Sequence, residues 1–160
     1  MIIAGVDPGL SGGLAFLNSR DYRLATFDMP ILEMTKSKKK KRFVDCAFLG
    51  SYFSEFRPDR CYVEQVGAMP GQGVTSMFNF GRAVGSIDGI AGALLIPIHY
   101  VTPRQWKKHF GLVAAKDASR ARAAQIFPAN SADFKLKKND GRAEAALIAE
   151  WGRRYEQGPA

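Results

Sequence analysis

The first 29 residues constrain the fold more than any other part of the chain, because they contain three short segments with the character of β-strands. Residues 2–6 form an apolar run that ends in Asp-Pro-Gly, residues 13–17 form a second apolar run, and residues 23–29 alternate between two faces. Short runs bounded by such turn residues are typical of strands. Since short connections join antiparallel neighbours, we predict a three-stranded antiparallel meander.

The rest of the chain alternates between helix-like and strand-like segments. Apolar residues at helical spacing predict a helix over 43–56, which Pro58 ends, and a strand over 60–66 follows. Further elements are predicted as a helix at 75–94, a strand at 94–101, and helices at 103–110, 117–127 and 139–155. This order predicts an α/β fold, in which a five-stranded mixed sheet is flanked by helices in one domain over residues 1–160.

The charge of the chain favours a polyanionic partner, because the formal net charge is +8 over 160 residues. Residues 36–42, with the sequence Lys-Ser-Lys-Lys-Lys-Lys-Arg, are predicted to form a solvated, mobile loop. Cys46 and Cys61 stand among apolar residues and are interpreted as buried free thiols, with no disulfide framework and no zinc spacing.

The sequence predicts neither a signal peptide nor a membrane span. The chain begins directly with a strand-like segment, and its longest apolar stretch, residues 83–98, is interrupted by Asp88 and by several glycines. We therefore expect a cytoplasmic location in a bacterial or phage-infected cell, and we disfavour an organelle because no transit peptide is present.

Three glycines in the predicted helix 75–94 are spaced four residues apart. Gly81, Gly85 and Gly89 therefore share one face of the helix. Each costs about 1 kcal/mol relative to alanine in a helix interior, so a close approach of another backbone is the expected compensation. The face packs either on the sheet or on a second subunit.

Four acidic residues from three separate segments are candidates for a metal site. Asp7 follows the first strand, Glu64 lies within the strand 60–66, and Asp140 and Glu144 are four apart and share a helix face. A carboxylate within a strand is costly to desolvate without a partner, and carboxylate oxygens suit Mg²⁺ or Mn²⁺. Two such ions would support phosphodiester hydrolysis. The structural alternatives are a turn role for Asp7, an exposed edge position for Glu64 and helix N-terminal acidity for Asp140.

These residues lie in motifs that resemble a known family. Gly5-Val6-Asp7-Pro8-Gly9, Tyr62-Val63-Glu64-Gln65 and Asp140-Gly141-Arg142-Ala143-Glu144-Ala145 resemble the three acidic motifs of RuvC-type Holliday junction resolvases, in the same order. The likeness is greatest to the chloroplast resolvases and to phage or bacterial RuvC-like proteins, and it extends from Met1 to about Trp151.

The resemblance implies a ribonuclease-H-like fold and a homodimer that cuts four-way DNA junctions symmetrically. It also implies two Mg²⁺ ions per active site, for which Mn²⁺ can substitute. Carried over, Asp7 is the central metal ligand, Glu64 and Glu144 complete the site, and Asp140 is the fourth ligand. The chain departs from bacterial RuvC at the last motif, where the spacing is four with a final Glu instead of three with a final Asp. Both spacings place the two acids on one side of a helix.

The family also has a basic segment before its last motif, which Pro103-Arg104-Gln105-Trp106-Lys107-Lys108 resembles, with Trp106 predicted to point inward. Lys116 is predicted to stabilise charge at the scissile phosphate. The family inserts a side chain at the junction centre from the region 67–80, where we consider Met69, Met77, Phe78 and Phe80. The predicted DNA-binding residues are Lys38, Lys39, Lys40, Lys41, Arg42, Met69, Phe78, Arg82, Arg104, Lys107, Lys108 and Arg120.

Three other functions stay open at this point. A YqgF-like RNA-processing nuclease shares the Asp-Pro-Gly start, and a non-catalytic binder of branched nucleic acid would not need all four acids. The segment Asp7 to Gly13 also resembles the phosphate loop of actin-like ATPases, but those proteins clamp the nucleotide between two such domains. We expect no nucleotide cofactor.

Overall fold

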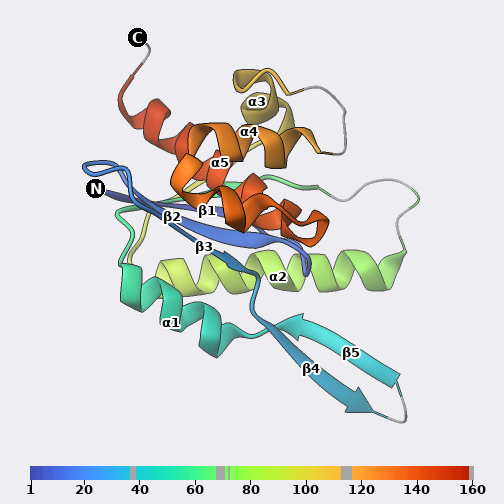
Figure 1. The fold of residues 1–160 in the computed structure, drawn as a ribbon. Coiled ribbons are helices and arrows are strands. Elements are labelled where there is room, and N and C mark those ends of the chain that lie inside the picture. The colour runs from blue at the N-terminus through green and yellow to red at the C-terminus, as the bar shows by residue number, and fades with distance from the viewer. Residues whose placement is uncertain (37–38, 68–70, 72, 113–116, 159–160) are drawn as a thin grey trace.

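The computed structural model describes residues 1–36, 39–67, 71, 73–112 and 117–158. Its central sheet has five strands in the order β3-β2-β1-β6-β7 (Figure 1). These are β1 (Ile2–Asp7), β2 (Gly13–Asn18), β3 (Leu24–Asp28), β6 (Arg60–Glu64) and β7 (Ile98–Val101). The first three are antiparallel neighbours, while β6 pairs in parallel with β1 and with β7. The predicted meander and the mixed five-stranded sheet are confirmed.

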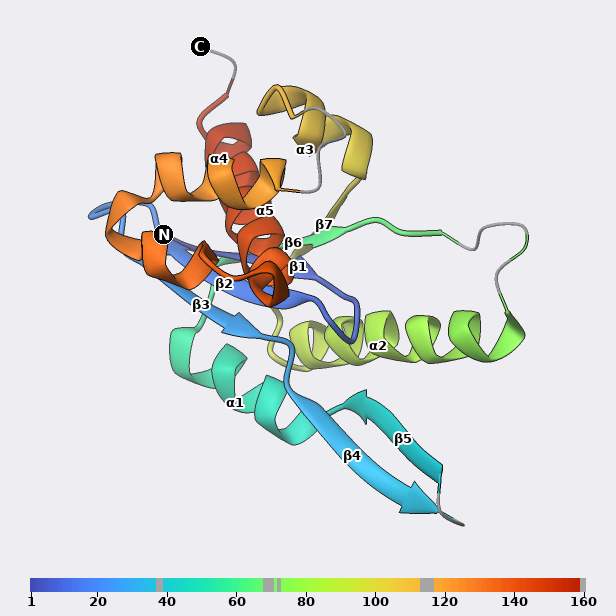
Figure 2. The same cartoon turned by 45° about the vertical axis from the view of Figure 1, so that its right-hand side comes forward.

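Helices cover both faces of this sheet (Figures 1 and 2). One face carries α1 (Cys46–Phe56) and α2 (Val74–Ala93), and the other carries α3 (Pro103–His109), α4 (Ala118–Ile126) and α5 (Asp140–Glu156). Two short 3₁₀ segments, η1 (Pro128–Phe134) and η2 (Lys137–Asn139), lead into α5. The buried side chains accordingly divide into two apolar clusters, one on each face of the sheet.

The central strands read as near-continuous apolar runs because they are covered on both sides. Ile3, Ala4 and Val6 of β1 are fully buried, as are Leu14 and Leu17 of β2. A strand with two buried faces has no need for polar alternation. This explains why the sequence signals these strands by short apolar runs.

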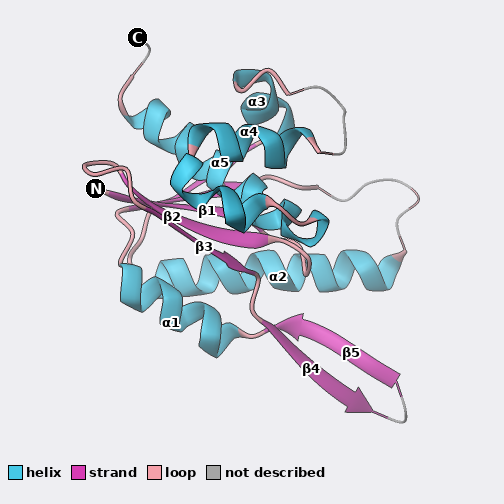
Figure 3. Cartoon of the chain, viewed as in Figure 1, coloured by secondary structure: helices cyan, strands magenta, loops and turns pink. Residues whose placement is uncertain are grey.

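The basic segment that was predicted as a mobile loop instead contains a strand. In the described residues, β4 (Ile31–Lys36) pairs antiparallel with β5 (Lys39–Val44) in a separate two-stranded sheet. Figure 3 shows this hairpin projecting away from the body of the protein. Ile31 and Val44 pack into the core at its base, which anchors two strands whose outer parts are charged. The helix that follows begins at Cys46 and not at residue 43.

Two further predictions are corrected by the structure. Cys61 is buried as predicted, but Cys46 is exposed, with its Sγ 3.3 Å from the hydroxyl of Ser86. The strand predicted from residue 94 begins at Ile98, because α2 ends at Ala93 and a turn with Leu95 at a φ of 56° precedes the strand. Among the described helices, none has the length and apolar character needed to cross a bilayer.

Candidate active site

Two of the predicted carboxylates stand at the same end of the central sheet. Asp7 is the last residue of β1, and Glu64 is the last residue of β6, which ends two residues earlier than predicted. The two strands are parallel neighbours with Val6 opposite Val63, so the residues that follow leave the sheet side by side. The carboxyl ends of neighbouring parallel strands are a frequent location of sites in α/β sheets.

Helix α5 is held against this end of the sheet by a very close backbone contact. Gly12 forms a β-bridge with Gly141, and a Cβ on Gly13 would lie 2.7 Å from the backbone nitrogen of Arg142. Only glycine permits such an approach. Arg142 also makes a bidentate ion pair with Asp28 at the end of β3, at 2.6 and 2.8 Å. The two carboxylates in the first turns of α5 are therefore fixed over the end of β1 and β6.

Asp7, Glu64 and Glu144 form an electrostatically coupled group, which we call the acidic cluster. Burial, followed by the negative charges of Glu64 and Glu144, raises the pKa of Asp7 to about 7. Burial also raises the pKa of Glu64, with a smaller contribution from Glu144. Ionising buried carboxylates that repel one another costs free energy, and a bound cation removes that cost.

Three side chains from α3 and α4 contact the acidic cluster. The indole Nε1 of Trp106 donates to Glu64 Oε1 at 3.0 Å in a buried hydrogen bond. Lys107 Nζ lies 3.4 Å from Glu144 Oε1, and the hydroxyl of Ser119 donates to the same oxygen at 3.1 Å. Trp106 points inward as predicted. The sequence does not predict its bond to Glu64 or the contact of Ser119 with Glu144, because nothing in the local sequence pairs these residues with the acids.

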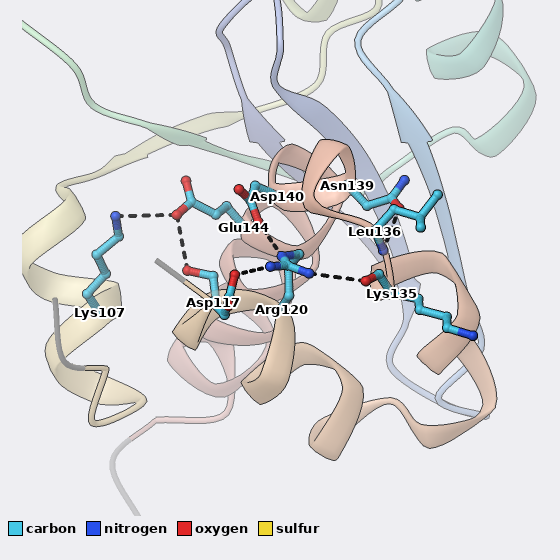
Figure 4. Close-up of polar contacts among 9 residues, drawn as sticks. Lys107, Asp117, Arg120, Lys135, Leu136, Asn139, Asp140 and Glu144 are labelled. Atoms are coloured by element: carbon cyan, nitrogen blue, oxygen red, sulfur yellow. Dashed lines mark hydrogen bonds and ion pairs between the residues drawn. The ribbon is translucent and has the colours of Figure 1, made fainter. Parts of the chain in front are cut away.

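Asp140 has a different environment from the acidic cluster. Its Oδ1 lies 2.6 Å from Nε of Arg120 (Figure 4). The same guanidinium contacts the carboxylate of Asp117 and donates to the backbone carbonyl of Lys135 at 3.1 Å. Arg120, which the sequence suggested as a DNA contact, therefore has its nitrogens directed into the protein, and its side chain is only 13% exposed.

The acidic cluster fits a divalent metal ion in the chemistry of its donors. Carboxylate oxygens are the ligands that Mg²⁺ and Mn²⁺ prefer, and the coupling between Asp7, Glu64 and Glu144 provides the excess negative charge. Within the part of the chain that the structure describes, no group of three or more His, Cys, Asp or Glu side chains is already arranged around a metal position. The carboxylates of Glu64 and Glu144 instead contact Trp106, Lys107 and Ser119 of α3 and α4.

One other buried carboxylate does not belong to this site. Glu150 of α5 is fully buried, but Arg153 and Arg154 each approach it to 2.7 Å. These arginines lower its pKa despite its burial. Glu150 is therefore a neutralised structural charge and not a candidate ligand.

Apart from Arg120 on α4, the predicted DNA-binding residues that the structure describes separate into three locations. Arg104 and Lys108 are exposed on α3, next to Lys107 at the acidic cluster. Lys40, Lys41 and Arg42 are exposed on β5 of the hairpin, where Lys40 pairs with Glu33 at 2.8 Å. The placements of Lys38, Met69 and Lys116 and the side chain of Lys39 lie outside the described residues.

The first half of α2 presents the remaining candidates. Phe78 is 67% exposed, whereas Met77 and Phe80 are half-buried. Arg82 lies one turn further along, with its guanidinium 4.5 Å from the ring centre of Phe43 on β5. Helix α2 and the hairpin are therefore neighbours, and both begin beyond the end of the sheet where β3 and β6 finish.

Comparison with known proteins finds a similar sequence. The chain is 30% identical over 152 residues to the chloroplast Holliday junction resolvase MOC1 of Chlamydomonas reinhardtii. The match covers 81% of this chain but 17% of the relative, so the chain spans less than a fifth of that protein's length. No protein-family model matches the chain. The relative is a chloroplast protein, and the predicted cytoplasmic location stays a prediction.

Solved structures match over nearly the whole chain. RuvC from T. thermophilus, in complex with a Holliday junction substrate, matches with a TM-score of 0.66 at 19% identity, covering 99% of this chain and 96% of RuvC. The yeast mitochondrial Holliday junction resolvase Ydc2 matches with a TM-score of 0.62 at 13% identity, covering 97% of this chain and 78% of Ydc2. The chain thus has the ribonuclease-H-like fold of the RuvC-type Holliday junction resolvases and resembles a resolvase in sequence.

Proposed function

We propose that the chain is a structure-selective endodeoxyribonuclease that resolves four-way DNA junctions. The observation that carries the proposal is the acidic cluster, which lies at the end of β1 and β6 in a fold shared with RuvC. A nuclease needs negative charge that a metal ion can neutralise, and the raised pKa of Asp7 marks such a concentration of charge.

In this proposal the metal ligands are Asp7, Glu64 and Glu144, with Asp140 as the predicted fourth. Two bound Mg²⁺, or Mn²⁺ in their place, would activate a water and stabilise the leaving oxygen of a phosphodiester. The hydrogen bond from Trp106 holds Glu64 in position at the sheet end. Lys107, which is 42% exposed and 3.4 Å from Glu144, is placed to donate a hydrogen bond to a phosphate oxygen at the same site.

Neutralising single members of the acidic cluster tests this site. Glu64→Gln and Glu144→Gln keep the side-chain volume but remove a charge, so cleavage of a synthetic junction in Mg²⁺ is expected to fall at least about 100-fold while junction binding persists. Glu55→Gln makes the same chemical change on the exposed surface of α1 and serves as the matched control. Cleavage that survives either cluster variant at the control level would contradict the proposed site.

We also propose that the hairpin and the first half of α2 bind the DNA arms. Lys41 and Arg42 extend from the body on β5, and the exposed ring of Phe78 is a candidate wedge at the junction centre. Lys41→Gln with Arg42→Gln is expected to weaken junction binding and to lower the slope of log affinity against log salt by about 2. Arg20→Gln with Arg23→Gln removes the same charge at the opposite end of the sheet and is expected to leave that slope unchanged.

A homodimer is supported by the glycine face of α2. A Cβ placed on Gly81, Gly85 or Gly89 would meet nothing within 4 Å, so this face does not pack on the sheet. The sequence left two possible neighbours for this face, the sheet or a second subunit. We propose that it contacts a second subunit. A two-fold dimer would present two active sites to a four-way junction, as symmetric cleavage requires.

A further inference from the structure

A groove lies at the end of the sheet opposite to the acidic cluster. Its volume is about 650 Å³, and it is lined where α1 and α2 end and where β6 and β7 begin. In Figure 1 both helices end on the side of the molecule away from the hairpin. Because β6 carries Glu64 at its far end, the groove is about 13 Å from the acidic cluster along that strand. A molecule bound in the groove would leave the acidic cluster free.

Both helices end at this groove on a residue type that the local backbone disfavours. Arg57 follows α1 with a φ of 44°, and Leu95 lies just beyond α2 with a φ of 56°. Their N–H groups close the helix ends, at 3.0 Å from the carbonyl of Phe53 and 3.1 Å from that of Gly92. Glycine usually occupies this position, because a left-handed backbone is costly for a residue with a Cβ.

Packing within the chain does not compensate for this strain. Tyr22, the other described non-glycine residue with a positive φ, stacks on Phe127 at 5.4 Å between ring centres. In contrast, Leu95 is 89% exposed, and its neighbour Leu94 is 42% exposed. Arg57 is also exposed. Backbone strain at two positions on one groove, without packing in return, indicates a role in binding.

The polar side chains of the groove leave positive charge at its rim. Asp59 is held against the start of β1, where it accepts from the N–H of Ile2 at 2.7 Å. Arg60 is 39% exposed, and its Nε lies 3.7 Å from Glu156. Arg57 and Arg60 are therefore placed to meet a carboxylate next to the exposed leucines.

We propose that this groove binds a short peptide segment of another protein, which combines apolar side chains with carboxylates. Leu94 and Leu95 would contact the apolar side chains, and Arg57 would pair with a carboxylate. Ten residues line the groove, whereas a stable interface between folded subunits needs about 20 from each side. A second copy would also bring a net charge of +8 to the two arginines, and a phosphate backbone offers no apolar surface to Leu95.

Nuclear magnetic resonance titration of the ¹⁵N-labelled chain tests the proposal without metal or DNA, so its outcome is independent of the proposed nuclease activity. The probe is a synthetic seven-residue peptide of alternating leucine and glutamate. We expect amide shifts confined to the groove and a dissociation constant of about 100 μM. Peptides with lysine in place of glutamate, or serine in place of leucine, are expected to bind at least about tenfold more weakly.

Leu95→Gly separates a binding role from a structural one. It removes the apolar contact and relieves the backbone strain, so peptide affinity is expected to fall at least about tenfold while the melting temperature rises by about 2 °C. Leu136→Gly removes an exposed leucine with a φ of −91°, and is expected to change neither affinity nor melting temperature in that direction. A lower melting temperature for Leu95→Gly would assign Leu95 to the fold and overturn the proposal.

Arg57→Gln tests the charge of the proposed ligand. Affinity for the leucine–glutamate peptide is expected to fall about fivefold and to depend less on salt. Arg122→Gln removes the same charge from α4, on the other face of the sheet, and is expected to leave the affinity unchanged. Absence of shifts at the groove would overturn the proposal. So would a DNA duplex that shifts the same amides at lower concentration than the peptide, because the groove would then be a nucleic-acid contact.

Discussion

At the scale of single residues, Asp7 links the stability of the protein to its proposed metal site. Its pKa is raised from 3.8 to about 7 by burial and by two neighbouring glutamates. An acid whose pKa is raised on folding favours the folded state while it is protonated, so its contribution is lost as the pH rises through the folded pKa. A shift of this size corresponds to at most about 4 kcal/mol.

The raised pKa of Asp7 predicts how the stability of the metal-free protein depends on pH. Between pH 4 and pH 8 the wild type is expected to lose stability relative to Asp7→Asn, because asparagine cannot ionise. Thermal melts of the two proteins in a metal chelator, at several pH values, measure the difference. Addition of Mg²⁺ at pH 8 is expected to raise the melting temperature of the wild type and not of the variant. Parallel pH profiles of the two proteins in chelator would show that ionisation of Asp7 does not destabilise the wild type.

The hydrogen bond from Trp106 to Glu64 leads to a second prediction about single residues. Trp106→Phe keeps a buried aromatic ring but removes the N–H that lowers the pKa of Glu64, so that pKa is expected to rise further. Loss of a hydrogen bond to a buried charged group costs about 2 kcal/mol, which denaturant unfolding at pH 8 measures. Trp151→Phe makes the same change at a partly buried tryptophan stacked on Tyr155 and is expected to cost less. Equal losses would assign the effect to packing.

The sequence reveals the acids of the candidate site better than their partners. Asp7, Glu64 and Glu144 can be identified because a carboxylate at a strand end or on an apolar helix face needs an explanation. Ser119 and Arg120 carry no such signal, since polar residues on a helix surface are ordinary. Only the packing of α4 across α5 brings them to the carboxylates.

At the scale of elements, the docking of α5 on the sheet fixes the site. A Cβ on Gly5 of β1 would overlap the carbonyl oxygen of Ala145 and the nitrogen of Ala149. Gly5→Ala is therefore expected to destabilise the fold by about 3 kcal/mol or more. Gly50→Ala in α1, where the added Cβ meets nothing within 4 Å, is expected to stabilise by about 1 kcal/mol. Denaturant unfolding compares the two, and a tolerated Gly5→Ala would contradict the observed packing.

The hairpin shows where prediction from local sequence fails for an element. The run of basic residues at 36–42 has the charge density of a solvated loop. Its strand character depends on pairing with residues 31–36, in particular Ile31 opposite Val44 and Leu32 opposite Phe43. Pairing of this kind is a non-local property. The helices could be predicted from their own periodicity, and the central strands mostly from short apolar runs bounded by turn residues.

At the scale of the whole molecule, the glycine face of α2 predicts the state of assembly. Gly85→Gln is expected to favour the folded monomer, because the side chain projects into open space within one chain but would block the approach of a second helix. Sedimentation velocity measures the change from dimer to monomer. Thr75→Gln, at an exposed position near the start of the same helix, is the control and is expected to remain dimeric. A wild-type monomer would contradict the proposed dimer.

The central claim is that a metal-dependent acidic cluster on a RuvC-like fold cuts four-way junctions. The most direct test is cleavage of an end-labelled synthetic four-way DNA junction in Mg²⁺ by the wild type and by Asp7→Asn, with linear duplex as the control substrate. We predict paired symmetric nicks by the wild type, and binding without cleavage by the variant. Absence of junction cleavage, or equal cleavage of plain duplex, would contradict the account and favour RNA processing or simple binding.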